Sequence, residues 1–133
     1  MIFKECVDKI FILNENKNIF ERLSLMTSVL DGNSIIFFKK INNKVIASYV
    51  VNKYTEDTLE TIFIEVDKDY RNQGVATELM KAVINYCKNH NKKIITSDFS
   101  KEGEKYIKCQ MRNIANENNV NYYTSKEEYE WFN

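Results

Sequence analysis

Residues 60–80 read ETIFIEVDKDYRNQGVATELM and contain the pattern that decides the fold. The first seven residues, ending at Val66, are rich in β-branched and aromatic side chains, which favour a strand. A polar loop follows over 67–73, and a helical pattern begins at Gly74. The apolar positions of that pattern share one helix face and are Ala76, Leu79, Met80, Val83 and Cys87. The stretch therefore predicts a strand, a loop and a helix from about 74 to 88.

The predicted start of this helix has the properties of a phosphate-binding site. The first turn of any helix leaves backbone N–H groups without partners and carries the positive end of the helix dipole. Gly74 lets an anion approach the backbone, and the small Ala76 keeps that approach open. Arg71 adds a fixed positive charge. These residues predict a ligand with a phosphate or diphosphate group, although an ordinary strand–helix turn can also contain one glycine.

Further strand patterns precede this unit. Residues 2–7 can form a first strand, and two β-rich runs over 35–41 and 44–51 predict a hairpin. Asn42-Asn43 joins the two runs, and Asn tolerates the positive φ of a tight turn. A turn at 55–58 leads into the strand that ends at Val66.

Two helices are predicted between the first strand and the hairpin. Asp8 is a suitable cap for a helix that contains Ile10, Phe11 and Leu13. The second helix is supported by apolar residues at spacings of four, three and four, and Asp31-Gly32-Asn33 ends it. Its apolar residues are Ile19, Leu23, Met26 and Leu30.

The C-terminal part predicts a strand at 94–96, a helix capped by Ser100 and a last strand at 120–123. The aromatic tail with Tyr129, Trp131 and Phe132 is expected to pack on the body of the protein. The full order is β-α-α-β-β-β-α-β-α-β. It predicts one α/β (α+β) domain over 1–133, in which an antiparallel meander precedes a strand–helix–strand crossover.

The run 66–80 resembles the acyl-CoA signature of the GNAT superfamily of N-acyltransferases. The pattern of that family is Arg or Gln, two residues, Gly, one residue, then Gly or Ala. Arg71, Gly74 and Ala76 match it in register, and Tyr70 and Leu79-Met80 agree with it. The run lacks the Gly-Lys-Ser/Thr of a P-loop and the three glycines of a Rossmann fingerprint. The order of elements extends the resemblance over most of the chain.

The resemblance implies a GNAT-like fold, with a central mixed, mostly antiparallel sheet flanked by helices, and acetyl-CoA as co-substrate. The backbone of Ile64, Glu65 and Val66 is then expected to hold the thioester and the pantetheine arm, with an N–H near Val66 polarising the carbonyl. The loop and first helical turn are expected to bind the pyrophosphate through Arg71, Asn72, Gln73, Gly74, Val75, Ala76 and Thr77. An amine would attack the thioester directly, so no Ser-His or Cys-His pair is needed.

Two catalytic residues follow from the resemblance. Glu60 stands eleven positions before Arg71, where some members of the family have a general base. Strand parity predicts that Glu60 shares a face with Ile62 and Ile64 and that Glu65 faces the other way. The alternative for Glu60 is a solvent-facing glutamate at a strand end.

Tyr106 best matches the tyrosine that protonates the leaving thiolate in the family, and the alternative is a packing residue beside Ile107. The usual Asn-Ala-Tyr pattern is not reproduced, because Ser100 and Gly103 occupy that neighbourhood. The Gly-Phe that often follows this helix is replaced by residues 118–120, which puts the C-terminal half of the acceptor pocket in doubt. Cys109, one turn after Tyr106, is interpreted as an ordinary helix residue.

These patterns predict an N-acetyltransferase that acts on a primary amine of a small molecule or protein. The alternative is a non-catalytic acyl-CoA-binding module that regulates a partner, which the departures around Tyr106 keep open. A structural domain without a ligand is disfavoured by the phosphate loop. A homodimer is an expectation by analogy with the family.

Composition limits the other classes. Lys plus Arg and Asp plus Glu are 19 each, so no global basic field favours nucleic acid. No run reaches the roughly 18 apolar residues of a membrane span, and the charged N-terminus does not read as a secretory signal, so the cytoplasm is expected. Three cysteines without a C-x-x-C pair and a single histidine, His90, predict reduced thiols and no metal site.

Overall fold

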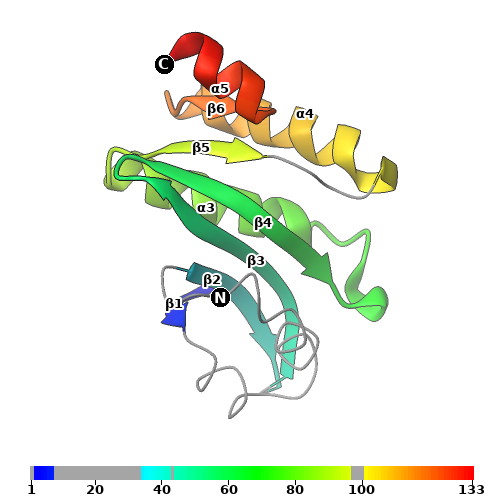
Figure 1. Cartoon of the computed structure of the whole chain (residues 1–133). Helices are drawn as coiled ribbons and strands as arrows, with labels where there is room; N and C mark the ends of the chain where they lie inside the picture. The colour runs from blue at the N-terminus through cyan, green and yellow to red at the C-terminus, as the bar shows by residue number, and fades with distance from the viewer. Residues whose placement is uncertain (1, 8–33, 43, 97–100) are drawn as a thin grey trace.

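The computed structural model describes residues 2–7, 34–42, 44–96 and 101–133, and its centre is a six-stranded sheet (Figure 1). The strand order is β1-β2-β3-β4-β5-β6. The strands are β1 (Ile2–Val7), β2 (Ser34–Ile41), β3 (Lys44–Thr55), β4 (Thr58–Val66), β5 (Lys93–Thr96) and β6 (Tyr122–Tyr123). Strands β1 to β4 pair antiparallel, whereas β5 pairs in parallel with both β4 and β6. The expectation of a mixed, mostly antiparallel sheet is confirmed.

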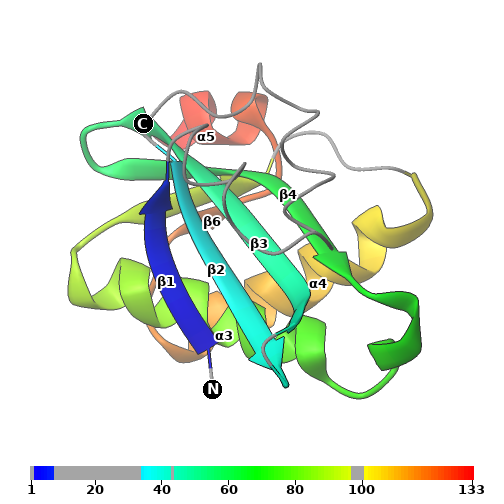
Figure 2. The same ribbon diagram turned by 90° about the horizontal axis from the view of Figure 1, so that it is seen from below.

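Two long helices cover one face of this sheet, as both ribbon views show (Figures 1 and 2). They are α3 (Val75–Asn89) and α4 (Lys101–Glu117). The predicted apolar face of α3 is buried except for Ala76, which is half-buried. Packing of an amphipathic face, more than intrinsic propensity, stabilises helices of this length.

The core lies between the sheet and these two helices. The side chains of Tyr49, Leu79, Met80, Ile84 and Ile94 are among the largest that are fully buried. Burying one aliphatic or aromatic side chain of this size stabilises a fold by roughly 1.5–3 kcal/mol. Three of these five residues belong to α3, so the core fixes α3 against the sheet.

A β-bulge interrupts the pairing of β3 with β4. Val50 pairs with Phe63 and Val51 pairs with Thr61, so Ile62 is an extra residue in β4. A bulge of this kind bends the strand and increases its local twist. It also changes which residues of β4 share a face, and it therefore decides the face on which Glu60 lies.

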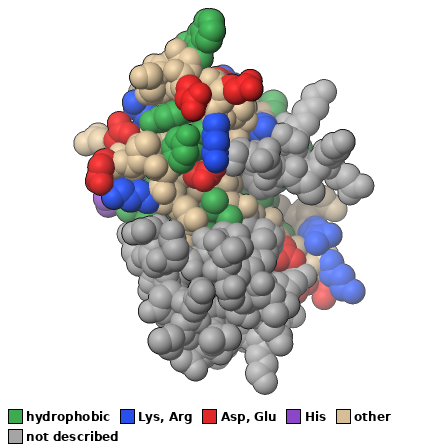
Figure 3. Space-filling model, in the orientation of Figure 1, with side chains coloured by type: hydrophobic (Ala, Val, Ile, Leu, Met, Phe, Trp, Pro, Cys, Tyr) green, Lys and Arg blue, Asp and Glu red, His purple; other side chains and the backbone are tan. Residues whose placement is uncertain are grey.

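The C-terminal segment differs from its prediction. Residues Lys126–Phe132 form a helix, α5, whose N-cap Ser125 accepts a hydrogen bond from the Glu128 backbone N–H. Trp131 is 84% exposed, so the expectation that it packs on the body is wrong. Phe132 is 68% exposed and contacts the body through the Tyr123 ring, with the ring centroids 6.4 Å apart. The space-filling view shows apolar side chains exposed at this end of the molecule (Figure 3).

Tyr129 also packs on the body, because its ring contacts those of Tyr54 and Tyr123 edge to face. The predicted strand at 120–123 is shorter than expected and covers only Tyr122–Tyr123. The predicted hairpin strand at 44–51 is longer than expected and reaches Thr55.

Several predictions lie outside the described residues. They are the helices over 8–33 with the Asp8 cap, the Asn43 half of the hairpin turn, and the Ser100 cap. Asn42, the other half of that turn, has a φ of 52°, as the prediction requires. No helix of the described part is long and apolar enough to cross a membrane.

Candidate active site

Strands β4 and β5 pair over only part of the length of β4. Thr58–Thr61 pairs with Lys93–Thr96, and Thr61 with Thr96 is the last pair that the structure describes. Beyond this pair β4 continues to Val66, and Figure 1 shows the two strands diverging. Beyond Thr61, no described strand pairs with β4 on this side.

The loop after β4 is held by its own hydrogen bonds. The Asp67 backbone N–H donates to the Ile46 carbonyl oxygen at 2.7 Å, which continues the contact between β3 and β4 past the strand end. The Asp67 carboxylate then accepts from the Asp69 N–H at 3.0 Å and starts a 3-10 turn, η1 (Lys68–Tyr70). These contacts fix the direction in which the chain enters the next turn.

Arg71 folds back on the strand rather than projecting away from it. Its Nε donates to the Val66 carbonyl oxygen at 3.0 Å, and the Gln73 side-chain amide donates to the Asp69 carbonyl at 3.3 Å. Asn72 has a φ of 61°, a left-handed conformation that Asn adopts more readily than most residues. These hydrogen bonds therefore hold the loop in one conformation up to the start of α3.

The start of α3 is open, as the sequence predicts. Gly74 is the N-cap, with a φ of 80°, and no side chain caps the helix. The first helical bond runs from the Glu78 N–H to the Gly74 carbonyl at 3.0 Å, which leaves the N–H groups of 75–77 without helical partners. The helix itself begins at Val75, one residue later than expected.

The space in front of Gly74 is empty. A Cβ built on this residue would meet no atom within 4 Å, and residues 71–74 are all exposed. Uncapped N–H groups, a positive helix end and open space are the conditions under which a helix start binds phosphate. The residues present therefore fit the diphosphate of coenzyme A, and any L side chain at position 74 would be strained.

The bulge at Ile62 overturns the prediction that Glu60 shares a face with Ile64, whereas Glu65 lies on the face opposite to Ile64, as predicted. Tyr49, which pairs with Ile64, contacts Met111 of α4 through its hydroxyl, so Ile64 faces the helices. Glu60 and Glu65 pair with Asn52 and Ser48 and so lie together on the opposite face. Glu60 therefore does not share a face with Ile64, because the extra residue shifts the alternation by one.

Glu60 lies in an ion pair with the C-terminal helix. Its Oε2 is 3.4 Å from the Lys126 ammonium, and its side chain is only 15% exposed. The solvent-facing alternative is thus not what the structure has. Glu60 belongs to the part of β4 that is still paired with β5, opposite Ile95, and so it precedes the divergence of the strands.

Tyr106 lies near the start of α4 and is 59% exposed. Its hydroxyl accepts a weak hydrogen bond from the Gln110 amide at 3.4 Å. The exposure argues against a packing role, because the ring gives most of its surface to solvent. Figures 1 and 2 place the starts of α3 and α4 and the end of β4 at the same end of the molecule.

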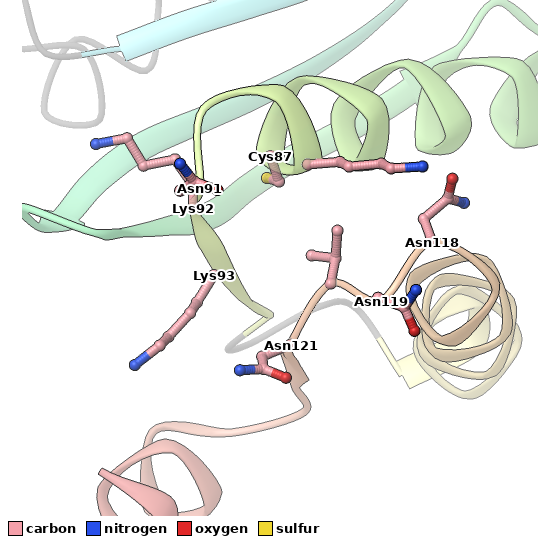
Figure 4. A pocket seen from close by; sticks show the side chains of 9 residues that line it. Cys87, Asn91, Lys92, Lys93, Asn118, Asn119 and Asn121 are labelled. Atoms are coloured by element: carbon pink, nitrogen blue, oxygen red, sulfur yellow. The ribbon is translucent and has the colours of Figure 1, made fainter.

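A cavity of about 390 Å³ opens at the other end of α3 and α4 (Figure 4). Its walls are Cys87 and Lys88 of α3 and the segments 91–93 and 118–121. Helix C-termini carry the negative end of the dipole and disfavour phosphate. The ammonium of Lys93 donates to Asn133 at 2.6 Å, and the labelled Lys93 side chain points away from the cavity. No candidate site residue lines this cavity.

A mixed sheet in which two parallel strands diverge beside an uncapped helix start is the arrangement of the GNAT fold. A family model described as "Acetyltransferase (GNAT) family" matches residues 8–109 of the 133-residue chain. The chain belongs to the GNAT family of acetyltransferases. No curated protein sequence is significantly similar to the chain.

Solved structures agree on the fold. The ribosomal-protein-S18-alanine N-acetyltransferase from Escherichia coli is similar with a TM-score of 0.61 and 13% identity, over 86% of this chain and 76% of that chain. A GNAT family acetyltransferase from Elizabethkingia anophelis, solved with acetyl-CoA bound, has a TM-score of 0.55 and 23% identity, over 80% of this chain and 71% of that chain. An aminoglycoside acetyltransferase from an uncultured soil metagenomic sample has a TM-score of 0.53 and 14% identity, over 85% of this chain and 86% of that chain.

Sequence reasoning missed two features of the site. The bulge has one weak signal, the run of three apolar residues over 62–64, which breaks strict alternation. No pattern in the sequence indicates the ion pair of Glu60 with Lys126, because the pair depends on the position of α5, a helix that the sequence patterns do not predict.

Proposed function

We propose that this protein transfers an acetyl group from acetyl-CoA to a primary amine of a small molecule or protein. One observation carries the proposal: α3 begins at an uncapped, exposed Gly74 directly beside the divergence of β4 and β5. The start of α3 binds a diphosphate, and the end of β4 offers backbone groups to the amides of a pantetheine arm.

The residues have the following roles in this proposal. The N–H groups of the loop and first turn, from Arg71 to Thr77, hold the pyrophosphate. The backbone of Ile64–Val66 holds the thioester and directs a carbonyl toward an N–H near Val66. The amine nitrogen attacks the carbonyl carbon and loses a proton to solvent. The carbon–sulfur bond breaks, and the Tyr106 hydroxyl donates a proton to the leaving sulfur and regains one from solvent.

Acetyl-CoA binding tests the first half of the proposal. Titration calorimetry is expected to give a dissociation constant in the micromolar range for the unchanged protein. In Gly74→Glu, a carboxylate occupies the phosphate space and binding is lost. The matched control is Asn91→Glu, which adds the same charge at another positive-φ position, beyond the other end of α3. Equal loss in both variants, or no binding by the unchanged protein at 1 mM, would contradict the site.

Thiol release with a panel of amines tests the second half. The panel contains peptides with a free α-amine, aminoglycosides and polyamines. The first two follow the acceptors named for two of the similar structures. Turnover with any of them supports the enzyme. Binding of acetyl-CoA without turnover on the whole panel would instead favour the non-catalytic acyl-CoA-binding module.

A further inference from the structure

The outer side of α5 carries an apolar patch with an acidic rim. Glu127, Glu130 and Trp131 are spaced by three and four residues and so lie on one side of the helix. Trp131 and its neighbour Phe132 are 84% and 68% exposed, and neither Glu127 nor Glu130 has an ion pair among the described residues. An exposed aromatic patch rimmed by charged groups is typical of a surface that contacts another protein.

The cavity at the ends of α3 and α4 is lined by basic and amide side chains. Its lining has three lysines and four asparagines but no aspartate or glutamate. Lys92 and Lys93 donate hydrogen bonds within the chain, whereas Lys88, exposed in the last turn of α3, has no partner among the described residues. The buried residues Cys87 and Val120 supply the apolar part of the wall. The cavity thus offers a positive group beside apolar surface, which complements the patch on α5.

Asn118 adds a hydrogen-bond acceptor to this cavity (Figure 4). Its side-chain nitrogen donates to the Ile114 carbonyl oxygen at 2.8 Å, and no described residue donates to its amide oxygen. An indole ring has one N–H that donates and no acceptor. The cavity volume of about 390 Å³ is within the range of sites that bind small organic groups. A tryptophan side chain therefore matches the cavity in size, apolar surface and hydrogen bonding.

The patch and the cavity are neighbours on the molecule. Lys93 in the cavity wall donates to Asn133, the C-cap residue of α5, at 2.6 Å. Figure 4 shows the Lys93 side chain pointing from the cavity toward α5. A patch and a complementary hollow that lie side by side permit a closed pair of molecules. When the patch of one copy enters the hollow of a second, a two-fold axis brings the second patch into the first hollow.

We propose that two copies of this chain form a two-fold symmetric dimer, in which the Trp131 side chain of each copy enters the cavity of the other. The indole ring then covers the apolar part of the wall, and its N–H donates to the amide oxygen of Asn118. Glu130, one residue before Trp131, lies at the mouth of the cavity and pairs with Lys88. The inference does not depend on the proposed acetyl transfer, because the cavity is at the end of α3 away from Gly74.

Charge and contact size favour a second copy as the partner. The chain has 19 basic and 19 acidic residues, so two copies carry no net charge that would keep them apart. Both complementary surfaces are also present on every copy, and each dimer forms the contact twice. The contact is made by one short helix and one cavity, which is less than the roughly 800 Å² per partner of a standard stable interface. We therefore expect a dimer that dissociates on dilution.

Sedimentation velocity of the full chain tests the dimer over protein concentrations from about 1 to 500 µM. The mean mass is expected to rise from that of one chain toward that of two. Trp131 is the only tryptophan, so its fluorescence should shift to shorter wavelength over the same range as the indole becomes buried. Trp131→Ala should stay monomeric, whereas the control Tyr106→Ala removes an exposed ring at the other end of the molecule and should dimerise normally. A monomer at every concentration, or a dimer that survives Trp131→Ala, would overturn the proposal.

Charge reversal tests which groups meet in the dimer. Lys88→Glu and Glu130→Lys are each expected to raise the dimer dissociation constant at least about tenfold, because each places like charges at the contact. The double variant restores an opposite pair and should return the constant to within about threefold of the unchanged protein. Lys81→Glu is the matched control, since it reverses an exposed lysine elsewhere on α3. No recovery in the double variant would overturn the contact of Lys88 with Glu130.

Acetyl-CoA binding keeps this test separate from that of the proposed function. Trp131→Ala should bind acetyl-CoA within about twofold of the unchanged protein, because the dimer leaves the start of α3 open. A protein that dimerises but does not bind acetyl-CoA would overturn the acetyltransferase site alone. A protein that binds acetyl-CoA but stays monomeric would overturn the dimer alone.

Discussion

The ammonium of Lys39 on β2 lies 2.7 Å from the carboxylate of Glu78 in the first turn of α3. The pair joins the sheet to the helix whose start is proposed to bind the diphosphate. Lys39 is the more buried partner, with 18% of its side chain exposed against 45% for Glu78. Beyond holding the helix, Lys39 offsets a negative charge that would otherwise repel the incoming phosphates.

Replacing this lysine is expected to weaken cofactor binding. Lys39→Met leaves Glu78 without its counter-charge, and an exposed pair of this kind contributes about 0.3–1 kcal/mol. Acetyl-CoA affinity should therefore fall about two- to fivefold at low salt, and less at 0.5 M salt because the charges are screened. The matched control is Lys53→Met, since Lys53 pairs with Glu56 at the same 2.7 Å in a turn away from the site. Equal effects in both variants would contradict this role.

The backbone of Gly74 should tolerate asparagine better than alanine. A φ of 80° costs an L residue about 1–2 kcal/mol, and Asn loses less because it adopts this region more readily. Urea unfolding is expected to show Gly74→Ala less stable than the unchanged protein by that amount, with Gly74→Asn in between. No atom lies within 4 Å of the added Cβ, so the loss cannot come from a clash. Equal stabilities would show that the left-handed conformation is not held in solution.

The last pairing between β4 and β5 is supported by buried hydroxyl groups. Tyr49 Oη and Thr61 Oγ1 lie 2.6 Å apart, and Thr96 Oγ1 donates to Thr61 at 3.4 Å. Tyr49→Phe leaves the Thr61 hydroxyl with a weaker partner and should lower the free energy of unfolding by about 1–2 kcal/mol. Adding Thr61→Val to that variant is expected to recover part of the loss, because both polar partners are then gone. A double variant less stable than the sum of the single ones would contradict this account.

Stability is expected to fall at alkaline pH. Burial raises the pKa of the Cys87 thiol from 9.0 to about 12 and that of Tyr122 from 10.0 to about 12. The unfolded chain loses these protons first, so the folded state binds more protons and the free energy of unfolding decreases as pH rises from about 9 to 12. Each group contributes at most about 1.4 kcal/mol per pH unit.

Guanidinium unfolding between pH 8 and pH 10 measures this slope. Cys87→Ala should remove most of it below pH 10, apart from a constant loss of packing. Cys109→Ala changes an exposed thiol and serves as the control. A slope that Cys87→Ala leaves unchanged would mean that the thiol is accessible in the folded protein.

Tyr106 is expected to affect turnover and not binding. Tyr106→Phe removes the proposed proton donor to the thiolate and should lower kcat by about 10- to 100-fold, with acetyl-CoA affinity unchanged. The ring is 59% exposed, so the free energy of unfolding should change by less than about 0.5 kcal/mol. A variant with full kcat would assign the protonation of the thiolate to solvent.

The sequence allowed the strand–loop–helix geometry around Gly74 to be predicted well, and phosphate binding there stays a prediction. Gly74 and the apolar face of α3 are local features, because turn chemistry and a 3.6-residue period follow from nearby residues alone. Asn42 has the positive φ that its place in a turn requires. The order β2-β3-β4 also follows, since short connections join these neighbouring strands.

The catalytic half could not be predicted in the same way. The face of a β4 residue depends on pairing with β3, and one bulge at Ile62 moves Glu60 away from Ile64. The Lys126 partner of Glu60 is 66 residues away in sequence, so no local pattern reports it. The α5 helix was not predicted, because the aromatic residues of the tail indicate a packing segment. Its local signal in the sequence is the N-cap residue Ser125.

The extra residue in β4, Ile62, affects the curvature of the strand but not its pairing with β3. Deleting Ile62 would leave Thr61 opposite Val51 and Phe63 opposite Val50, with every pair and every face as before. What would disappear is the local twist that the additional residue introduces. The bulge comes directly after Thr61, where the described pairing of β4 with β5 ends, so we expect deletion of Ile62 to reduce the divergence of these two strands.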